Sequence, residues 1–195
     1  MMENRLRLMV DKARILGLPY DQTLPEDLRA IYQKADHQSR LLSAKELEQI
    51  CIFSGIDAGP ILLLQEQTPL FVSKVKESLL AEEPELIQPG GALYPEIRAQ
   101  ACWRDCWHFL RIALYALAAD RTAFTHLPGV NGLSELYREL KVPIASMARA
   151  LGHLRSESVA CYASVGGGLD AWRLDQALLH LEEMIRQFSF SRNSV

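Results

Sequence analysis

Long apolar runs are missing from this sequence of 195 residues. No stretch approaches the ~20 apolar residues that a membrane-spanning helix needs, and the first residues lack the apolar core of a secretory signal. We therefore expect a cytosolic protein whose contact with a membrane is at most peripheral.

An excess of charge of either sign is also lacking. The chain has 21 Lys and Arg against 24 Asp and Glu, which gives a net charge of −3 and a pI near 6.0. A basic surface for nucleic acid is therefore not expected. The hydrophobic fraction of 49% and the charged fraction of 23% are ordinary, and the length suits one domain with a substantial core.

Cysteine is scarce, with only Cys51, Cys102, Cys106 and Cys161. Four cysteines do not make a disulfide framework in a chain of this length, and the cytosol disfavours disulfides, so we expect reduced thiols. Cys102 and Cys106 have a metal-like spacing with His108 nearby. At ~100° per residue, however, His108 projects about 160° away from Cys106, and no second ligand pair is evident. We expect no metal site.

Strand patterns are absent as well, because no segment alternates or is dense in β-branched residues. The sequence predicts an all-α domain of roughly seven to nine helices. The clearest start is at Ser43, which forms a capping box with Glu46 and opens a helix to about Phe53. Thr23 and Asp170 are predicted to cap two further helices.

The first 20 residues predict a short amphipathic helix that ends at Gly17 and Pro19. Basic residues alternate there with apolar ones: Arg5, Arg7, Lys12 and Arg14. This helix is expected to pack on its own domain or on a partner subunit. Contact with a membrane surface is the less favoured alternative, because the segment is short.

Residues 101–119 contain neither Gly nor Pro and predict a long helix. Its core face is predicted to comprise Trp103, Trp107, Leu110, Leu114 and Leu117. The neighbouring face has mostly small side chains, which could leave a groove beside the core; it carries Cys102, Asp105, Cys106, Phe109, Ala113 and Ala116. Cys102 and Asp105 are neighbours there, because positions i and i+3 meet on a helix. Arg104 lies about 160° from Cys102 and would serve a group reaching round the side.

This stretch resembles the phycobiliproteins, the bilin-carrying antenna subunits of cyanobacteria and red algae, and allophycocyanin subunits most of all. The likeness rests on Pro89-Gly90-Gly91, Tyr94, Cys102-x-Arg104-Asp105 and Leu110-Arg111. It continues through Tyr115, Gly132, Glu135, Tyr137, Leu140, Pro143 and Ile144, and upstream through Ala35-Asp36, Arg40, Leu42-Ser43 and Glu46-Leu47. It covers roughly residues 33–187.

The resemblance implies a globin-like all-α fold, preceded by an N-terminal helical pair used for subunit pairing. We expect an N-terminal helical extension over residues 1–24 and the globin-like domain over residues 25–195. In the family, the cysteine matching Cys102 forms a thioether to ring A of a linear tetrapyrrole, here expected to be phycocyanobilin-like. The aspartate matching Asp105 accepts hydrogen bonds from the pyrrole nitrogens of rings B and C, and the arginine matching Arg104 pairs with a propionate. Phe109 and Tyr115 complete the candidate pigment contacts, although such aromatic residues more often serve packing.

The resemblance further implies a light-harvesting subunit that passes on excitation and performs no turnover. Its partners would be other phycobiliprotein subunits or linker proteins in an oligomer at the thylakoid surface, in the cyanobacterial cytosol or the plastid stroma. The alternative is a pigment-free interaction protein for assembly, turnover or regulation of the antenna or photosystem. Departures from the family pattern favour it: Ala92 where Asn is usual, Trp107 and His108, and a shorter segment between residues 50 and 89. An enzyme is least supported, since no nucleophile–base pair or carboxylate dyad falls on one surface.

Overall fold

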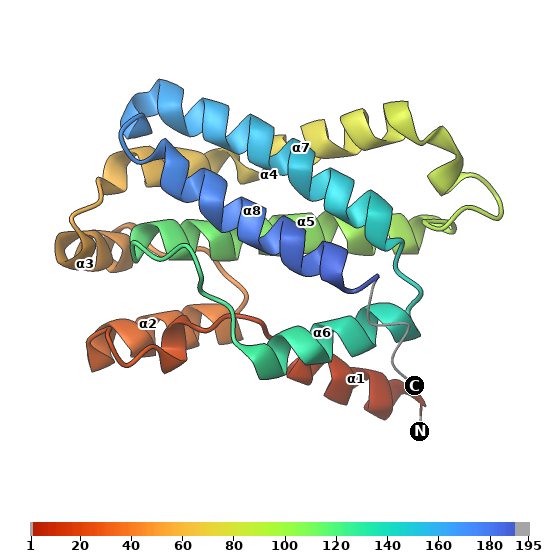
Figure 1. Ribbon diagram of the computed structural model, residues 1–195, viewed down its shortest axis with the longest axis horizontal. Helices are drawn as coiled ribbons and strands as arrows, with labels where there is room; N and C mark the ends of the chain where they lie inside the picture. Colours follow the sequence, from red (N-terminus) through yellow and green to blue (C-terminus); the bar gives the residue numbers. More distant parts are fainter. Residues whose placement is uncertain (1, 190–195) are drawn as a thin grey trace.

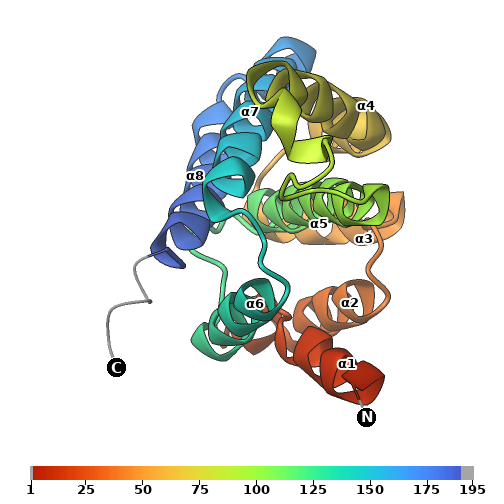
Figure 2. The ribbon, with the colours of Figure 1, turned by 90° about the vertical axis from the view of Figure 1, so that its right-hand side faces the viewer.

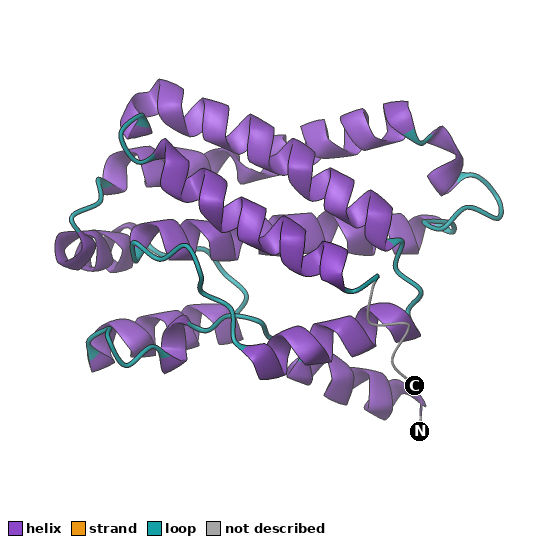
Figure 3. Cartoon of the chain, in the orientation of Figure 1, coloured by secondary structure: helices purple, strands orange, loops and turns teal. Residues whose placement is uncertain are grey.

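The computed structural model describes residues 2–189, with side chains from Arg5 onward, and these residues form eight α-helices (Figure 1). The helices are α1 (Met2–Lys12), α2 (Glu26–His37), α3 (Ala44–Ser54), α4 (Ala58–Glu82), α5 (Glu96–Ala118), α6 (Leu127–Glu139), α7 (Ile144–Tyr162) and α8 (Ala171–Gln187). The all-α prediction is confirmed, since these residues contain no strand (Figure 3). None of the described helices is both long and apolar enough to cross a membrane.

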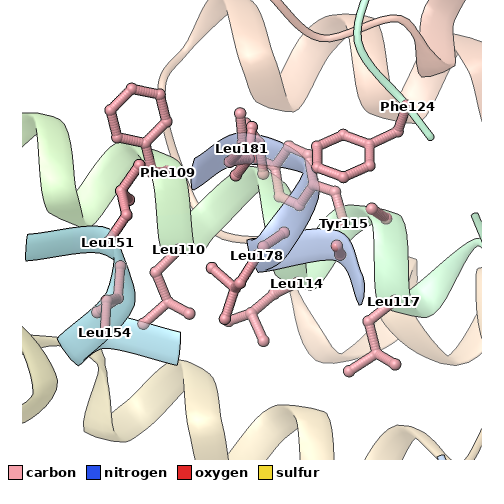
Figure 4. Close-up of a cluster of buried hydrophobic side chains, with 14 of the residues drawn as sticks. Phe109, Leu110, Leu114, Tyr115, Leu117, Phe124, Leu151, Leu154, Leu178 and Leu181 are labelled. Carbon is pink, nitrogen blue, oxygen red and sulfur yellow. The ribbon is translucent and has the colours of Figure 1, made fainter. Parts of the chain in front are cut away.

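Helix α5 lies at the centre of the fold. Figures 1 and 2 show α4, α7 and α8 on one side of it and α1, α2 and α6 on the other. Leu110, Leu114 and Leu117 are buried and point away from Phe109 (Figure 4). This part of the predicted core face is confirmed. Trp103 and Trp107 are only half-buried, which corrects the prediction at that end, because an indole is too large to be enclosed easily.

Short-range capping chemistry sets some helix starts as predicted. The Ser43 hydroxyl accepts a hydrogen bond from the Glu46 N–H, and the Glu46 carboxylate accepts one from the Ser43 N–H. Helix α3 then ends at Gly55, whose φ of 78° is left-handed.

The predicted cap at Thr23 is wrong, whereas Asp170 does lie at the N-cap position of α8 but makes no side-chain cap. The N–H and hydroxyl of Thr23 both donate to the Asp21 carboxylate, at 2.9 and 2.6 Å, so Thr23 stabilises a turn before α2 instead of capping it. The Asp170 carboxylate accepts from the Arg173 guanidinium at 2.6 Å and makes no cap hydrogen bond. In both places a strong local partner competes with the helix N-terminus.

The Pro-Gly-Gly turn before α5 needs both of its glycines. Gly90 has a φ of 90°, and a Cβ at Gly91 would collide with the backbone carbonyl oxygens of Glu85 and Leu86. The turn thereby brings the chain close to the short 3-10 turn at Pro84–Ile87, which follows α4. Helix α5 then starts at Glu96, earlier than the predicted start near residue 101, because Pro95 fits the position just before a helix.

The N-terminal helix is shorter than predicted. Helix α1 ends at Lys12 instead of reaching Gly17, and it packs on α6 of the same chain. The residues after it, up to Gly17, are not helical, and Leu16 forms an antiparallel bridge with Thr125. Helix α6 itself begins at Leu127, with Pro128 in its first turn.

Candidate pigment-binding site

The candidate site lies in the first half of α5, on the side that faces α6. Cys102 and Asp105 lie there one helical turn apart, as their spacing predicts. Cys102 is only 6% exposed, Cys106 is fully buried and Phe109 is buried. The predicted open groove is therefore wrong at Cys102, because small side chains on this face let neighbouring segments approach closely.

Asp105 is held by a residue from another helix. The Tyr137 hydroxyl of α6 donates to Asp105 Oδ2 at 2.9 Å. Arg104 Nη2 lies 3.7 Å from Asp105 Oδ1, and the two side chains are 66% and 26% exposed, respectively. Burial raises the pKa of Asp105 above its ordinary range, although Tyr137 and Arg104 both act to lower it. Tyr137 thus fixes the orientation of the carboxylate, but the hydrogen bond and the Arg104 charge do not offset the cost of burying its negative charge.

Tyr137 is a fixed hydrogen-bond donor. Burial, and after it the Asp105 carboxylate, raise its pKa well above the ordinary range, so the phenol keeps its proton. The Phe188 ring meets the Tyr137 ring edge-on at a centroid distance of 6.1 Å. Arg98 fixes the end of α6 by donating to the carbonyls of Leu140 and Lys141 at 3.0 and 3.1 Å. Helix α6 is therefore anchored to α5 at two points.

Tyr115 is not brought to this site. It lies ten residues beyond Asp105, or about 15 Å along the helix. Its hydroxyl accepts from Arg111 at 3.1 Å and donates to the Arg40 carbonyl. Arg111 pairs with Asp36 of α2 at 2.8 Å. Tyr115 thus belongs to a buried polar cluster that joins α2 to α5.

Comparison with known proteins identifies the family of this chain. The sequence matches the Phycobilisome protein family over residues 30–188. The chain belongs to this family. It is 32% identical over 131 residues to allophycocyanin subunit beta-18 of Pyropia yezoensis, covering 66% of this chain and 78% of the relative. The C-phycocyanin beta subunit of Arthrospira platensis is 30% identical over 133 residues, covering 67% and 77%.

Membership in the phycobilisome family confirms the predicted resemblance and the globin-like class of the fold. A third relative, the allophycocyanin alpha chain of Galdieria sulphuraria, is 31% identical over 130 residues, which is 65% of this chain and 80% of the relative. The family match begins at residue 30, so α1 and the connecting segment after it lie outside the matched region.

Two further groups on α5 of this phycobilisome-family chain, His108 and Cys106, favour their neutral forms. Burial, and then the Arg111 charge, lower the pKa of His108 to about 4, so its imidazole is neutral at pH 7. The neighbouring Cys102 thiol, and then burial, raise the pKa of Cys106. Among the residues that the structure describes, no three His, Cys, Asp or Glu side chains are grouped to hold a metal ion.

Sequence reasoning missed two residues of this site. Tyr137 is part of the family resemblance, but nothing local indicates that it meets Asp105, which lies 32 positions away. Arg98 bridges Ala92, at a Nε–O distance of 2.9 Å, to the end of α6. Both contacts join separate elements, so only the folded chain reveals them.

Proposed function

We propose that this protein is a light-harvesting subunit that carries a linear tetrapyrrole on Cys102 and passes excitation to neighbouring pigments. The observation that carries the proposal is Asp105, a largely buried carboxylate that Tyr137 orients one turn from a buried thiol. The names of the relatives, allophycocyanins and phycocyanins, support the same function.

The residues present fit such a pigment in chemistry. Tyr137 donates to Asp105 Oδ2, while Arg104 Nη2 lies 3.7 Å from Oδ1, so Oδ1 can accept hydrogen bonds from pyrrole N–H groups. Arg104 is mostly exposed and offers a planar fork that suits a propionate. Phe109 lies one turn beyond Asp105 and supplies an apolar wall. The bound pigment would supply the absorption of visible light.

Cys102 would attach the pigment covalently. Its S–H would add across a carbon–carbon double bond, with the sulfur bonding to one carbon and the proton moving to the other. Because Cys102 is only 6% exposed, attachment requires the covering side chains to move. Attachment is therefore expected to be faster on a partly folded chain, or with an attachment enzyme, than on the folded protein alone.

The test is to produce the protein together with a phycocyanobilin supply and attachment enzymes, and to record its absorption spectrum. Denaturing electrophoresis with zinc-induced fluorescence then shows whether the pigment is covalently bound. We expect red absorption and a fluorescent band that disappear in Cys102→Ala. Cys161→Ala is the matched control, since Cys161 lies on α7 away from the site, and it should keep both signals. Colour that survives in Cys102→Ala would contradict the proposed attachment.

A second candidate is a pigment-free interaction protein of the antenna, with other phycobiliprotein subunits or linker proteins as partners. The burial of Cys102 and Cys106 favours it, because a closed face needs no pigment to fill it. The same experiment separates the two functions. A folded, helical and colourless wild-type protein would support the second candidate, and co-purification with antenna subunits would then be the next measurement.

A further inference from the structure

We infer that residues 5–17, which precede the region matched by the family, form a strap that holds α6 against α5 and so positions Tyr137 on Asp105. The strap comprises most of α1 and the connecting residues from 13 to 17. The functional part of this inference rests on the proposed pigment site, whereas the packing part stands without it.

Two glycines of α6 form the seat of the strap. Gly129 and Gly132 lie one turn apart on the same face of α6 and are buried. A Cβ at Gly129 would collide with the backbone carbonyl of Arg14, and one at Gly132 with the carbonyl of Lys12. Side chains at these positions would therefore push the strap away. Glycine inside a helix destabilises it by about 1 kcal/mol relative to alanine. The close approach of the strap explains why glycine nevertheless stands at both positions.

Backbone hydrogen bonds continue the same contact. The His126 N–H donates to the Ile15 carbonyl at 3.0 Å, and the Gly17 N–H donates to the Phe124 carbonyl at 2.6 Å. Ile15 and Leu16 are buried in the main core. The strap is thus an integral part of the core, and it is fixed along the start of α6.

Arg14 links the strap to α2 and, through it, to α5. Its guanidinium donates to the Asp36 carbonyl at 2.7 Å and lies 3.7 Å from the Asp36 carboxylate. That carboxylate pairs with Arg111 of α5 at 2.8 Å. The strap therefore contacts both α6 and α2, which lie on the same side of α5 (Figure 2), and α6 supplies the Tyr137 hydroxyl that donates to Asp105.

The position of Tyr137 follows from this arrangement. Tyr137 lies on α6 five residues after Gly132, about 140° around the helix from it, and its hydroxyl donates to Asp105. If the strap no longer packs on Gly129 and Gly132, α6 is free to move relative to α5. The 2.9 Å hydrogen bond from Tyr137 to Asp105 is then no longer held in place. Arg14 is accordingly a positioning residue for Asp105 and does not itself touch the site.

The test uses the pigment-free full chain with Gly129→Ala and Gly132→Ala combined. Without a seated strap, two alanines should stabilise α6 through their helix propensity. With the strap seated there, we expect at least tenfold faster hydrogen exchange at the Gly17 and His126 amides. The Asp105 carboxyl, followed by carbon-13 NMR, should titrate at a higher pH than in the wild-type protein, because the Tyr137 hydrogen bond that lowers its pKa is no longer held in place. Gly152→Ala is the matched control, because a Cβ there would lie 3.8 Å from the Glu182 carboxylate, an ordinary contact.

Two results would overturn the inference. Unchanged exchange together with higher stability would show that the strap does not rest on these glycines. Faster exchange with an unchanged Asp105 titration would show that the strap packs there without positioning the site. If the wild-type protein takes up no pigment, the proposed function fails, but the Asp105 titration still decides the inference.

A milder variant covers the case in which the double alanine variant does not fold. Arg14→Gln removes the charge that faces Asp36 and keeps the length and polarity of the side chain. It should shift the Asp105 titration and the exchange rates in the same direction by a smaller factor. Arg7→Gln, an exposed position on α1, is its control and should change neither. Equal behaviour of the two variants would exclude a positioning role for Arg14.

Discussion

Asp105 is the residue at which the needs of folding and of the proposed function conflict. Burial raises its pKa, so the folded protein binds the Asp105 proton more tightly than the unfolded chain does. Stability is therefore lost as the pH rises from the ordinary value of 3.8 through the raised value, and the full cost is present at neutral pH. A carboxylate kept in place at such a cost is typical of a functional site.

Asp105→Asn is accordingly expected to stabilise the pigment-free protein. At pH 7 the melting temperature should rise by a few degrees, corresponding to about 1 kcal/mol, because the amide oxygen still accepts from Tyr137 without carrying charge. At pH 4 the gain should shrink. The same variant produced with pigment should lose red absorption, since the charged acceptor for the pyrrole N–H groups is gone.

Tyr137→Phe provides the comparison for this prediction. It leaves Asp105 Oδ2 without its donor and should lower the free energy of unfolding by about 1 kcal/mol or more. Thermal melts of both variants at pH 7 and pH 4 test the pair. A lower melting temperature for Asp105→Asn at pH 7 would mean that the ionised carboxylate contributes more through Tyr137 and Arg104 than its burial costs.

How much of the site the sequence predicts depends on the distance between its parts along the chain. Helical spacing brings Cys102 and Asp105 together and turns Arg104 outward, and the structure agrees with both expectations. The same spacing does not reveal that neighbouring segments cover the thiol. Nor does it place Tyr115 in the Asp36–Arg111 cluster, because that depends on how α2 crosses α5.

At the scale of the elements, the start of α3 shows when local sequence is decisive. Ser43 and Glu46 satisfy each other within one turn, and Arg40 adds an ion pair to Glu46 at 2.7 Å. Thr23 and Asp170 have equally suitable side chains but have competing partners nearby. A cap can therefore be predicted from sequence only where no stronger partner lies within reach.

The α3 cap gives a prediction for stability against pH. The Arg40 hydrogen bond, and the Ser43 groups, lower the pKa of Glu46 to about 2. The charge on Glu46 thus stabilises the folded state above pH 4.5, and this contribution is lost as the pH falls toward 2. Glu46→Gln should cost about 1–2 kcal/mol at pH 7, allowing for solvent screening of a partly exposed pair, and nearly nothing at pH 2.

Ser43→Ala should cost about 1 kcal/mol, because the Glu46 N–H loses its acceptor. Urea titrations across the pH range measure both variants. Lys45→Ala, an exposed neighbour in the first turn of α3, is the control and should change little. A cost of Glu46→Gln that does not vary with pH would show that the Arg40 pair contributes nothing to stability.

At the scale of the whole molecule, the sequence predicts the fold class well but not the arrangement of its layers. The absence of strand patterns and the periodicity of each segment are enough for an all-α domain, and the family resemblance adds the globin-like class. The position of residues 5–17 on α6 could not be predicted, because its signals are the two glycines at 129 and 132, which look unfavourable within a helix until the close backbone contact is seen.

The labelling rates of the four cysteine thiols measure which motions of the chain expose Cys102 to a pigment. Cys51, Cys102 and Cys106 are at most 6% exposed, while Cys161 is partly exposed, so a thiol reagent should label Cys161 first. Cys51 lies in the main core and should be labelled only through global unfolding, with a rate that rises steeply with urea.

Cys102 should behave differently if the proposed site is used. Cys102 lies on the side of α5 that faces α6. A local separation of these two helices should therefore expose the thiol, with a labelling rate that depends only weakly on urea. Mass spectrometry of labelled peptides, from the protein with Cys106→Ala to isolate the Cys102 signal, gives both slopes. Equal, steep slopes for Cys51 and Cys102 would mean that the thiol is reached only by unfolding the whole chain. Attachment of a pigment to the folded protein would then be excluded. The pigment would have to be attached during folding, or the protein would carry none.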